Sequence, residues 1–399
     1  MSGAPPQDTR LNPVIWQLGW VSFLQDMSSE MIIPRIPLFL TITLRAPVEA
    51  VGLIEGIAES VGSLGKVLFG WISDRAGARK PFAVFGYGLS ALSKPAMALA
   101  GSWPFVLVCR FADRVGKGVR TAPRDALIAE NSPVAVRGRA FGLHRSMDTA
   151  GAVVGPLIGY LIITFWNVGD RTLFLLAGIP ALLSVTVLAW RVTEKKQVSQ
   201  DQPSRPRLQW SKLTPRYRRF LLIVTLFSLG NSSDAFLILR ARAMGVPNAQ
   251  ILLLYAMFNT VEASLAYAAG KLSDRLDRRT LIIGGYLLFA SAYLGMAIGS
   301  AAIVAWLMFL LYGGYYTLTN GIQRAFAADN ADPERRATEI GAYHTCVGTA
   351  LLPASLIAGV LYQHFGSSTP FYTGGIIALL CALLLTREIA GERRAAVEV

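Results

Sequence analysis

Long apolar runs constrain the fold of this chain more than any other feature. About twelve segments of roughly 20 residues are predominantly apolar, the length an α-helix needs to cross some 30 Å of hydrocarbon. In lipid, every backbone N–H and C=O must be paired within the chain, and runs this long and uniform are unlike the strands of a membrane barrel. We therefore predict an all-α membrane protein with twelve transmembrane helices.

The predicted spans leave only short loops, two brief tails and one central linker. They are expected at residues 13–44, 49–73, 81–100, 103–125, 138–165, 170–191, 218–240, 248–272, 280–300, 302–326, 338–363 and 369–388. Only 16% of the 399 residues are charged, against roughly 25% in an ordinary soluble domain. The chain has no room for a separate soluble catalytic domain.

The net charge of +13 first suggests nucleic acid as a partner, but the placement of the basic residues argues against it. Lys and Arg gather on alternate loops and in the linker, while the intervening loops carry few. Loops rich in Lys and Arg stay on the cytoplasmic side of a membrane. We expect a multi-pass protein of the cytoplasmic (inner) membrane with both termini inside, partnered by the lipid bilayer and not by nucleic acid.

The two halves of the chain resemble each other at an offset of about 200 residues. Matching pairs are Ser28-Ser29-Glu30 with Ser232-Ser233-Asp234, Gly70–Arg75 with Gly270–Arg275, and His144–Thr149 with His344–Thr349. Repeated bundles are common in transporters. We predict two six-helix bundles related by pseudo-two-fold symmetry, at residues 1–192 and 218–399, joined by a cytoplasmic linker at residues 193–217.

The stretch Gly70-Trp71-Ile72-Ser73-Asp74-Arg75-Ala76-Gly77-Ala78-Arg79-Lys80 resembles the loop motif of the major facilitator superfamily. A weaker copy runs from Gly270 to Arg279, with Asp277 in place of the inner glycine. The resemblance implies a transporter that works by alternating access, with this motif stabilising one conformation. The motif positions are Gly70, Asp74, Arg75, Gly77, Arg79, Gly270, Asp274 and Arg275.

Two further stretches resemble signatures of drug and metabolite exporters in that superfamily. Residues 151–159 are similar to the antiporter motif of the fifth span, through Gly151, Gly155, Pro156 and Gly159. Residues 114–122 are similar to a fourth-span motif but depart from it at Lys117 and Arg120. The glycines would let a neighbouring helix approach closely, and the proline would bend the span. Export is favoured over import.

Several ionisable residues fall within the predicted spans, where each costs roughly 2.5–3.5 kcal/mol at the bilayer centre. The candidates for proton coupling are Asp26, Glu30, Glu59, Arg110, Arg114 and Asp148. Candidates for a substrate cavity are Lys94, Asp234, Glu262, Tyr312 and Arg324. Trp20, Phe23, Tyr255 and Phe258 either line the cavity or pack elsewhere. We expect Asp26 and Glu30 to carry the proton and Arg114 to tune them.

The favoured function is proton-coupled efflux of a small organic solute by a protein that works as a monomer. Because Lys94, Arg110 and Arg114 are basic, transport of an organic anion or phosphorylated metabolite is the alternative. A membrane enzyme or receptor is a second alternative, although no HExxH, GxxxxGK[ST] or nucleophile motif supports an enzyme. The three cysteines lie far apart, and His144 and His344 are expected to make structural hydrogen bonds. We predict no metal and no cofactor.

Overall fold

A computed structural model describes residues 11–76, 79–133, 136–194, 210, 213–273, 275–332 and 335–397 of the chain. Within these residues the chain is built from helices and short turns, and it holds no β-strand. The all-α part of the fold class predicted from the apolar runs is confirmed for the described residues.

We call helices α1 to α7 the first half. They are α1 (Pro13–Ile32), α2 (Ile36–Leu38), α3 (Val48–Ala76), α4 (Lys80–Met97), α5 (Trp103–Glu130), α6 (Arg137–Trp166) and α7 (Asp170–Arg191). The second half comprises α8 (Pro215–Gly230), α9 (Asp234–Ala243), α10 (Gln250–Ser273), α11 (Arg278–Ile298), α12 (Ala302–Asn330), α13 (Arg336–Phe365) and α14 (Thr369–Val397).

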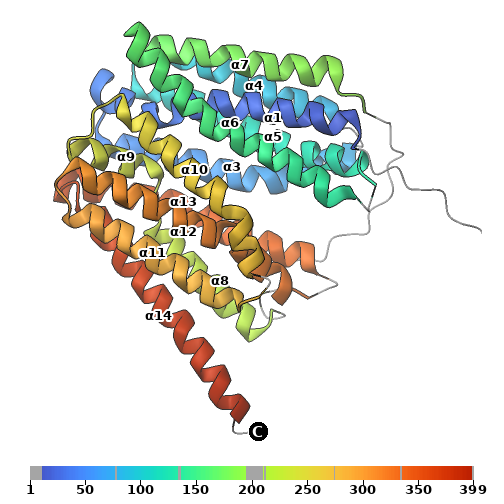
Figure 1. Ribbon diagram of the computed structural model, residues 1–399, viewed down its shortest axis with the longest axis vertical. Helices are drawn as coiled ribbons and strands as arrows, with labels where there is room; N and C mark the ends of the chain where they lie inside the picture. Colours follow the sequence, from blue (N-terminus) through green and yellow to red (C-terminus); the bar gives the residue numbers. More distant parts are fainter. Residues whose placement is uncertain are drawn as a thin grey trace, which may run out of the picture.

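The long helices run side by side in alternating directions, so the bundle has two ends (Figure 1). We name the end that holds Leu11, Glu194 and Pro215 the terminal end, and the other the opposite end. At the terminal end Glu194 accepts hydrogen bonds from the backbone N–H groups of Arg79 and Lys80. The turns before α3, α5, α7, α10, α12 and α14 lie at the opposite end.

Two predicted spans are broken rather than continuous. The first contains Pro34 and Pro37, which lack a backbone N–H, and after α1 it continues as a 3-10 turn η1 (Ile33–Arg35), the short α2, and a π turn η2 (Phe39–Thr43). The seventh stops at Gly230 and restarts at Asp234, where the Ser233 hydroxyl accepts from the N–H of Ala235 at 3.3 Å. This second break puts the Asp234 carboxyl at a helix start.

Eight helical segments among the described residues are long and apolar enough, by length and composition, to cross a membrane. They are α6, α7, the α8–α9 segment, and α10 to α14. The remaining long helices, α1, α3, α4 and α5, all belong to the first half. Polar and charged residues lower the hydropathy of these helices. Helix α5 alone carries five charged residues from Arg110 to Arg120.

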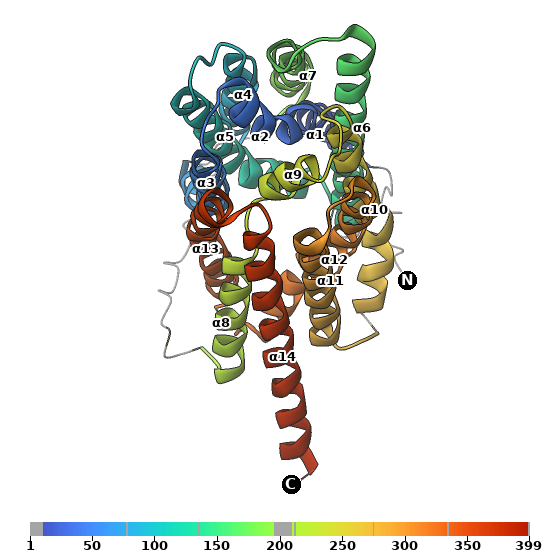
Figure 2. The same ribbon diagram turned by 90° about the vertical axis from the view of Figure 1, so that its left-hand side faces the viewer.

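The two halves meet along two seams, with α3 against α13 and α6 against α10 (Figure 2). Glycines bring the first pair close. A Cβ at Gly52 would collide with the carbonyl oxygen of Ser355, and one at Gly56 would lie 3.1 Å from the Cα of Leu352. Small residues at such contacts let helix backbones approach each other.

Candidate functional site

The candidate site lies in the middle of the bundle, where α3 and α6 meet the second half and α5 and α1 pack against them. Hydrogen bonds cross between the halves at this level. Asn259 of α10 donates to the carbonyl of Ala152 on α6 at 2.8 Å, and Ser60 of α3 donates to the carbonyl of Gly348 on α13 at 2.8 Å. At this level, side chains of each half therefore bond to the backbone of the other half.

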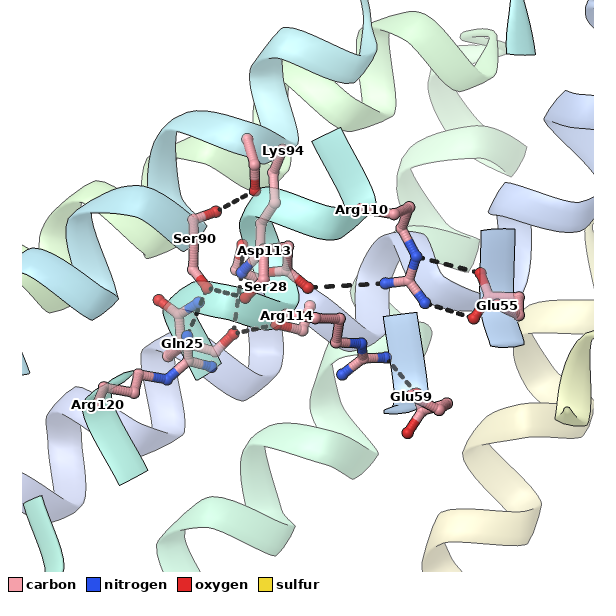
Figure 3. A network of polar contacts seen from close by, with 12 residues as sticks. Gln25, Ser28, Glu55, Glu59, Ser90, Lys94, Arg110, Asp113, Arg114 and Arg120 are labelled. Carbon is pink, nitrogen blue, oxygen red and sulfur yellow. Dashed lines mark hydrogen bonds and ion pairs between the residues drawn. The ribbon is translucent and has the colours of Figure 1, made fainter. Parts of the chain in front are cut away.

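A network of buried charges fills the first half beside this level (Figure 3). The Arg110 guanidinium on α5 donates two hydrogen bonds to the Glu55 carboxylate on α3, at 3.1 and 2.6 Å, and lies 3.6 Å from Asp113. The Arg110 and Glu55 side chains are only 1% and 7% exposed. One turn further along the same helices, Arg114 pairs with Glu59 at 2.8 Å. Each predicted basic residue on α5 thus has an acidic partner on α3.

Lys94, predicted to line a substrate cavity, lies inside the first half and is 1% exposed. Its ammonium group donates to the Ser28 hydroxyl at 3.0 Å and to the Gln25 carbonyl at 3.4 Å. In the same network the Arg120 guanidinium donates to the Ser90 hydroxyl at 2.5 Å (Figure 3). Lys94 therefore braces α4 against α1 in this structure.

The predicted proton carriers Asp26 and Glu30 lie one turn apart on α1 and are half-buried. Asp26 lies beside Asp148 of α6, which pairs with Arg145 at 3.1 Å. The Oε2 atom of Glu30 is buried, and among the described residues it has no hydrogen-bond partner. The structure thus brings Asp26 and Asp148 together and leaves one Glu30 oxygen unpaired.

Asp234 and Tyr312 are the predicted cavity residues that contact each other in the second half. The Tyr312 hydroxyl donates to the Asp234 carboxylate at 2.7 Å. The Phe258 ring lies 5.6 Å from that of Tyr312 and 5.5 Å from that of Tyr255, in an aromatic cluster. A carboxylate at the break of the seventh span is therefore held against aromatic rings. Trp20, by contrast, is 51% exposed on α1.

Glu262 and Arg324 lie closer to the terminal end. The Glu262 carboxylate is 3.8 Å from the Arg145 guanidinium, which joins α10 to α6 across the halves. The exposed Arg324 guanidinium donates to the side chain and backbone oxygens of Asn320, one turn earlier on α12. The structure places Glu262 near the acidic residues of the first half, while Arg324 bonds within its own helix.

The loop motif sits at the terminal end. Gly70, Asp74 and Arg75 belong to the last two turns of α3, and Gly77 and Asp274 lie outside the described residues. Beyond the gap, Arg79 donates to the Ser73 hydroxyl at 3.0 Å and lies 3.5 Å from the Glu130 carboxylate.

In the second copy, a Cβ at Gly270 would meet no heavy atom within 4 Å, and Arg275 is two residues past the end of α10 at Ser273. Asp277 caps the start of α11 by accepting from the backbone N–H of Arg279 at 3.0 Å. Burial raises the pKa of Asp277, but that N–H and the Arg279 guanidinium outweigh it, so this pKa lies below its ordinary value.

The glycines of the antiporter-like motif pack α6 onto α1. A Cβ at Gly151 would meet the Phe23 carbonyl, one at Gly155 the Met27 carbonyl, and one at Gly159 would lie 3.2 Å from the Met31 oxygen. These contacts repeat every four residues on both helices, with Pro156 buried inside α6. The backbone of α1, the helix that carries Asp26 and Glu30, therefore packs directly against the backbone of α6.

We expect Gly155→Leu to lower transport or make the protein leak protons, because its side chain would push α6 away from α1 beside Glu30. Overpacking of this kind costs about 1–3 kcal/mol. Transport and proton leak in vesicles are the measurements. Gly142→Leu is the matched control on the same helix, since a Cβ there meets nothing within 4 Å. Equal behaviour of the two variants would contradict the packing argument.

Sequence reasoning missed two members of the site. Glu55 shares a face of its predicted helix with Glu59, but nothing in the sequence identifies Arg110 as its partner. Asp113 lies between Arg110 and Arg114 in a predicted span, and an acidic residue between two basic ones is a signal that could have identified it. His144 accepts or donates a 2.7 Å hydrogen bond with the Ser22 hydroxyl, the kind of structural contact expected of it. Within the described ranges, no three His, Cys, Asp or Glu side chains are grouped as metal ligands.

The chain is similar to known proteins over most of its length. The family model described as Major Facilitator Superfamily matches residues 18–353. An uncharacterized MFS-type transporter of Methanocaldococcus jannaschii is 35% identical over 388 residues, 95% of each chain. The multidrug resistance protein MdtH of Photorhabdus laumondii is 28% identical over 358 residues, 85% of this chain and 84% of that protein.

A solved structure shows the same fold. The crystal structure of a POT family transporter in complex with 5-aminolevulinic acid superimposes with a TM-score of 0.78. It covers 93% of this chain and 95% of that one, at 12% sequence identity. Together with the matches in sequence, this likeness covers both halves of the bundle.

Proposed function

This chain belongs to the Major Facilitator Superfamily, and we propose that it exports a small organic solute in exchange for protons by alternating access. It is a membrane transporter and not an enzyme. Efflux draws support from the multidrug resistance relatives and from the packing of residues 151–159 on α1. Members of this superfamily usually work as monomers, and we extend that to this chain.

We further propose that the chain crosses the inner membrane twelve times. The broken segment from α1 to η2 then counts as one span and the α8–α9 segment as another, which leaves α3 to α7 and α10 to α14 as single spans. The terminal end faces the cytoplasm, in line with the excess of Lys and Arg on its loops. The six-helix bundles are residues 1–192 and 218–399, with a cytoplasmic linker at 193–217.

The observation that carries the proton-coupling proposal is the unpaired Glu30 oxygen. A buried carboxylate oxygen without a protein donor is costly when charged, so proton binding there stabilises the protein. The neighbouring Asp26–Asp148 contact supports the same conclusion, because two carboxyl groups in contact share a proton more easily than they both ionise. Arg114 pairs with Glu59 at 2.8 Å, and we assign Arg114 the role of tuning proton binding at Asp26 and Glu30.

The alternative of organic-anion transport has less support. It depended on Lys94, Arg110 and Arg114 offering positive charge to a solute. In the structure Arg110 and Arg114 are paired with carboxylates, and Lys94 is bonded inside the first half. We keep the loop motif around Asp74 as a conformational device, as proposed from the sequence.

The test uses everted membrane vesicles energised by respiration and loaded with a pH-sensitive dye. Candidate solutes come from comparing drug tolerance and metabolite content of cells with and without the protein. We expect an exported solute to accumulate and to dissipate the pH gradient only when the protein is present. A membrane potential of 100 mV supplies about 2.3 kcal/mol per charge moved, roughly a fifty-fold gradient. Accumulation by energised right-side-out vesicles would overturn export.

A further inference from the structure

Arg35 joins the two halves at the opposite end of the bundle. Its Nε donates to the Asp170 carboxylate of α7 at 2.7 Å, and its Nη1 donates to the backbone carbonyl of Asn248, just before α10, at 2.6 Å. The first contact stays within the first half, whereas the second reaches the second half. One guanidinium therefore ties η1, α7 and the turn before α10 together.

The Arg35 side chain and its partner Asp170 are shielded from solvent, whereas Asn248 is an exposed residue whose backbone carbonyl reaches the guanidinium. The Arg35 and Asp170 side chains are 9% and 10% exposed. Arg35 ends the 3-10 turn that Pro34 introduces, and Asp170 is the first residue of α7, where an acidic side chain also faces the positive end of the helix. A buried donor that loses its acceptor is penalised more than an exposed one, because water does not readily replace the partner.

Two other arginines at the same end provide a contrast. Arg171 donates to the carbonyls of Ala98 and Ala100, both in the first half. Arg240 donates to the carbonyls of Met296, Ala297 and Gly299 and to the Ser367 hydroxyl, all in the second half. These two close the loops of one half each, so of the three arginines it is Arg35 that spans the boundary.

Contacts on the α3–α13 seam also cross the halves at this end, but they are more exposed. The Val48 N–H donates to the Gln363 side chain at 3.0 Å, and His364 lies 2.6 Å from the Glu49 carboxylate. The side chains of that last pair are 60% and 37% exposed. Exposed pairs add little stability because water and salt compete for them.

We propose that Arg35 is a latch that holds the opposite end closed, anchored by Asp170 and released from Asn248 whenever the halves part there. The proposal rests on the alternating access of the proposed function. In the closed state the guanidinium satisfies both acceptors. In the open state its Nε bond to Asp170 persists and its Nη1 bond is lost, so the latch biases the protein toward the state closed at this end.

The test measures distances between spin labels at both ends of the purified full chain in lipid nanodiscs, without solute or proton gradient. One pair replaces the exposed Ser102 and Ser300 at the opposite end, and the other replaces Gly138 and Leu276 at the terminal end. The native cysteines 109, 346 and 381 are first changed to Ser or Ala. Each pair joins the first half to the second.

For Arg35→Gln we expect the ratio of open to closed molecules at the opposite end to rise about tenfold, which corresponds to about 1.4 kcal/mol. The distance at the terminal end should shorten in the same molecules. Arg35→Lys, which keeps the charge beside Asp170 but cannot serve both acceptors, should give a smaller shift in the same direction. It also tests the latch if the glutamine variant fails to fold.

Two variants serve as controls. Asn248→Ala should behave like the native protein, because the latch uses the backbone carbonyl. Arg240→Gln should lower thermal stability without a reciprocal change at the two ends. Unchanged distances in both Arg35 variants, or lengthening at both ends, would overturn the latch. The distance measurement does not depend on transport. A reciprocal shift at the two ends, combined with no proton-coupled efflux in the vesicle assay, would therefore overturn the proposed function and leave the latch standing.

Discussion

Glu55→Leu is expected to destabilise this protein by about 3–5 kcal/mol, the range seen when one partner of a buried ion pair is removed. The Arg110 guanidinium would keep its charge in a site that is 1% exposed, with Asp113 at 3.6 Å as its remaining acidic neighbour. The measurement is the temperature or denaturant concentration at which the purified protein unfolds in detergent. Expression of the variant should fall as well, since marginal stability limits abundance.

A double variant distinguishes the cost of leaving one charge unpaired from the cost of losing side-chain packing. Glu55→Leu with Arg110→Leu removes both charges, so it should be less destabilised than Glu55→Leu alone. Arg219→Gln is the surface control, because that side chain is 57% exposed in its 3.1 Å pair with Glu388, and such pairs contribute about 1 kcal/mol or less. A double variant as unstable as the single one would show that packing, and not charge, dominates at this site.

Glu30→Gln is expected to abolish solute accumulation driven by a proton gradient while leaving solute exchange without a gradient. The amide cannot take up a proton at this site, yet it fills nearly the same volume and removes an insertion cost. Asp26→Asn should impair coupling as well, since Asp26 lies beside Asp148. Accumulation and exchange are measured in the same reconstituted vesicles, so that a folding defect, which would lower both, is recognised.

Glu388→Gln is the matched neutral variant, because Glu388 pairs with Arg219 on α8, away from the seams between the halves. It should retain gradient-driven accumulation. If both Glu30→Gln and Asp26→Asn also retain it in full, neither residue carries the coupled proton.

Most helix boundaries could be predicted from the apolar runs, because a span in lipid needs a long apolar segment. The failures have local causes. Helix α5, the predicted fourth span, extends to Glu130, past the predicted end at residue 125. The added turn buries Leu127 and Ile128, and Glu130 lies 3.5 Å from the Arg79 guanidinium. The breaks after α1 and α8 were likewise invisible to hydropathy, which averages over a proline or a short turn.

The site could be predicted only as a set of positions. Ionisable residues are costly in lipid, so those within predicted spans became site candidates: Asp26, Glu30, Glu59, Arg110 and Arg114. Helical spacing gives the face on which a side chain lies but not its partner on another helix. The Arg110–Glu55 pair and the Arg35 contact with Asn248 depend on how helices pack, which the sequence pattern does not contain.

The Arg110–Glu55 pair also bears on how the protein is made. Its partners are 55 residues apart, on α3 and on the later helix α5. Each charge alone opposes transfer into lipid by roughly 2.5–3.5 kcal/mol. The helix bearing Glu55 therefore enters the bilayer most easily together with the helix bearing Arg110. We therefore expect α3 and α5 to leave the insertion machinery together, and a ribosome stalled before α5 should leave α3 poorly inserted.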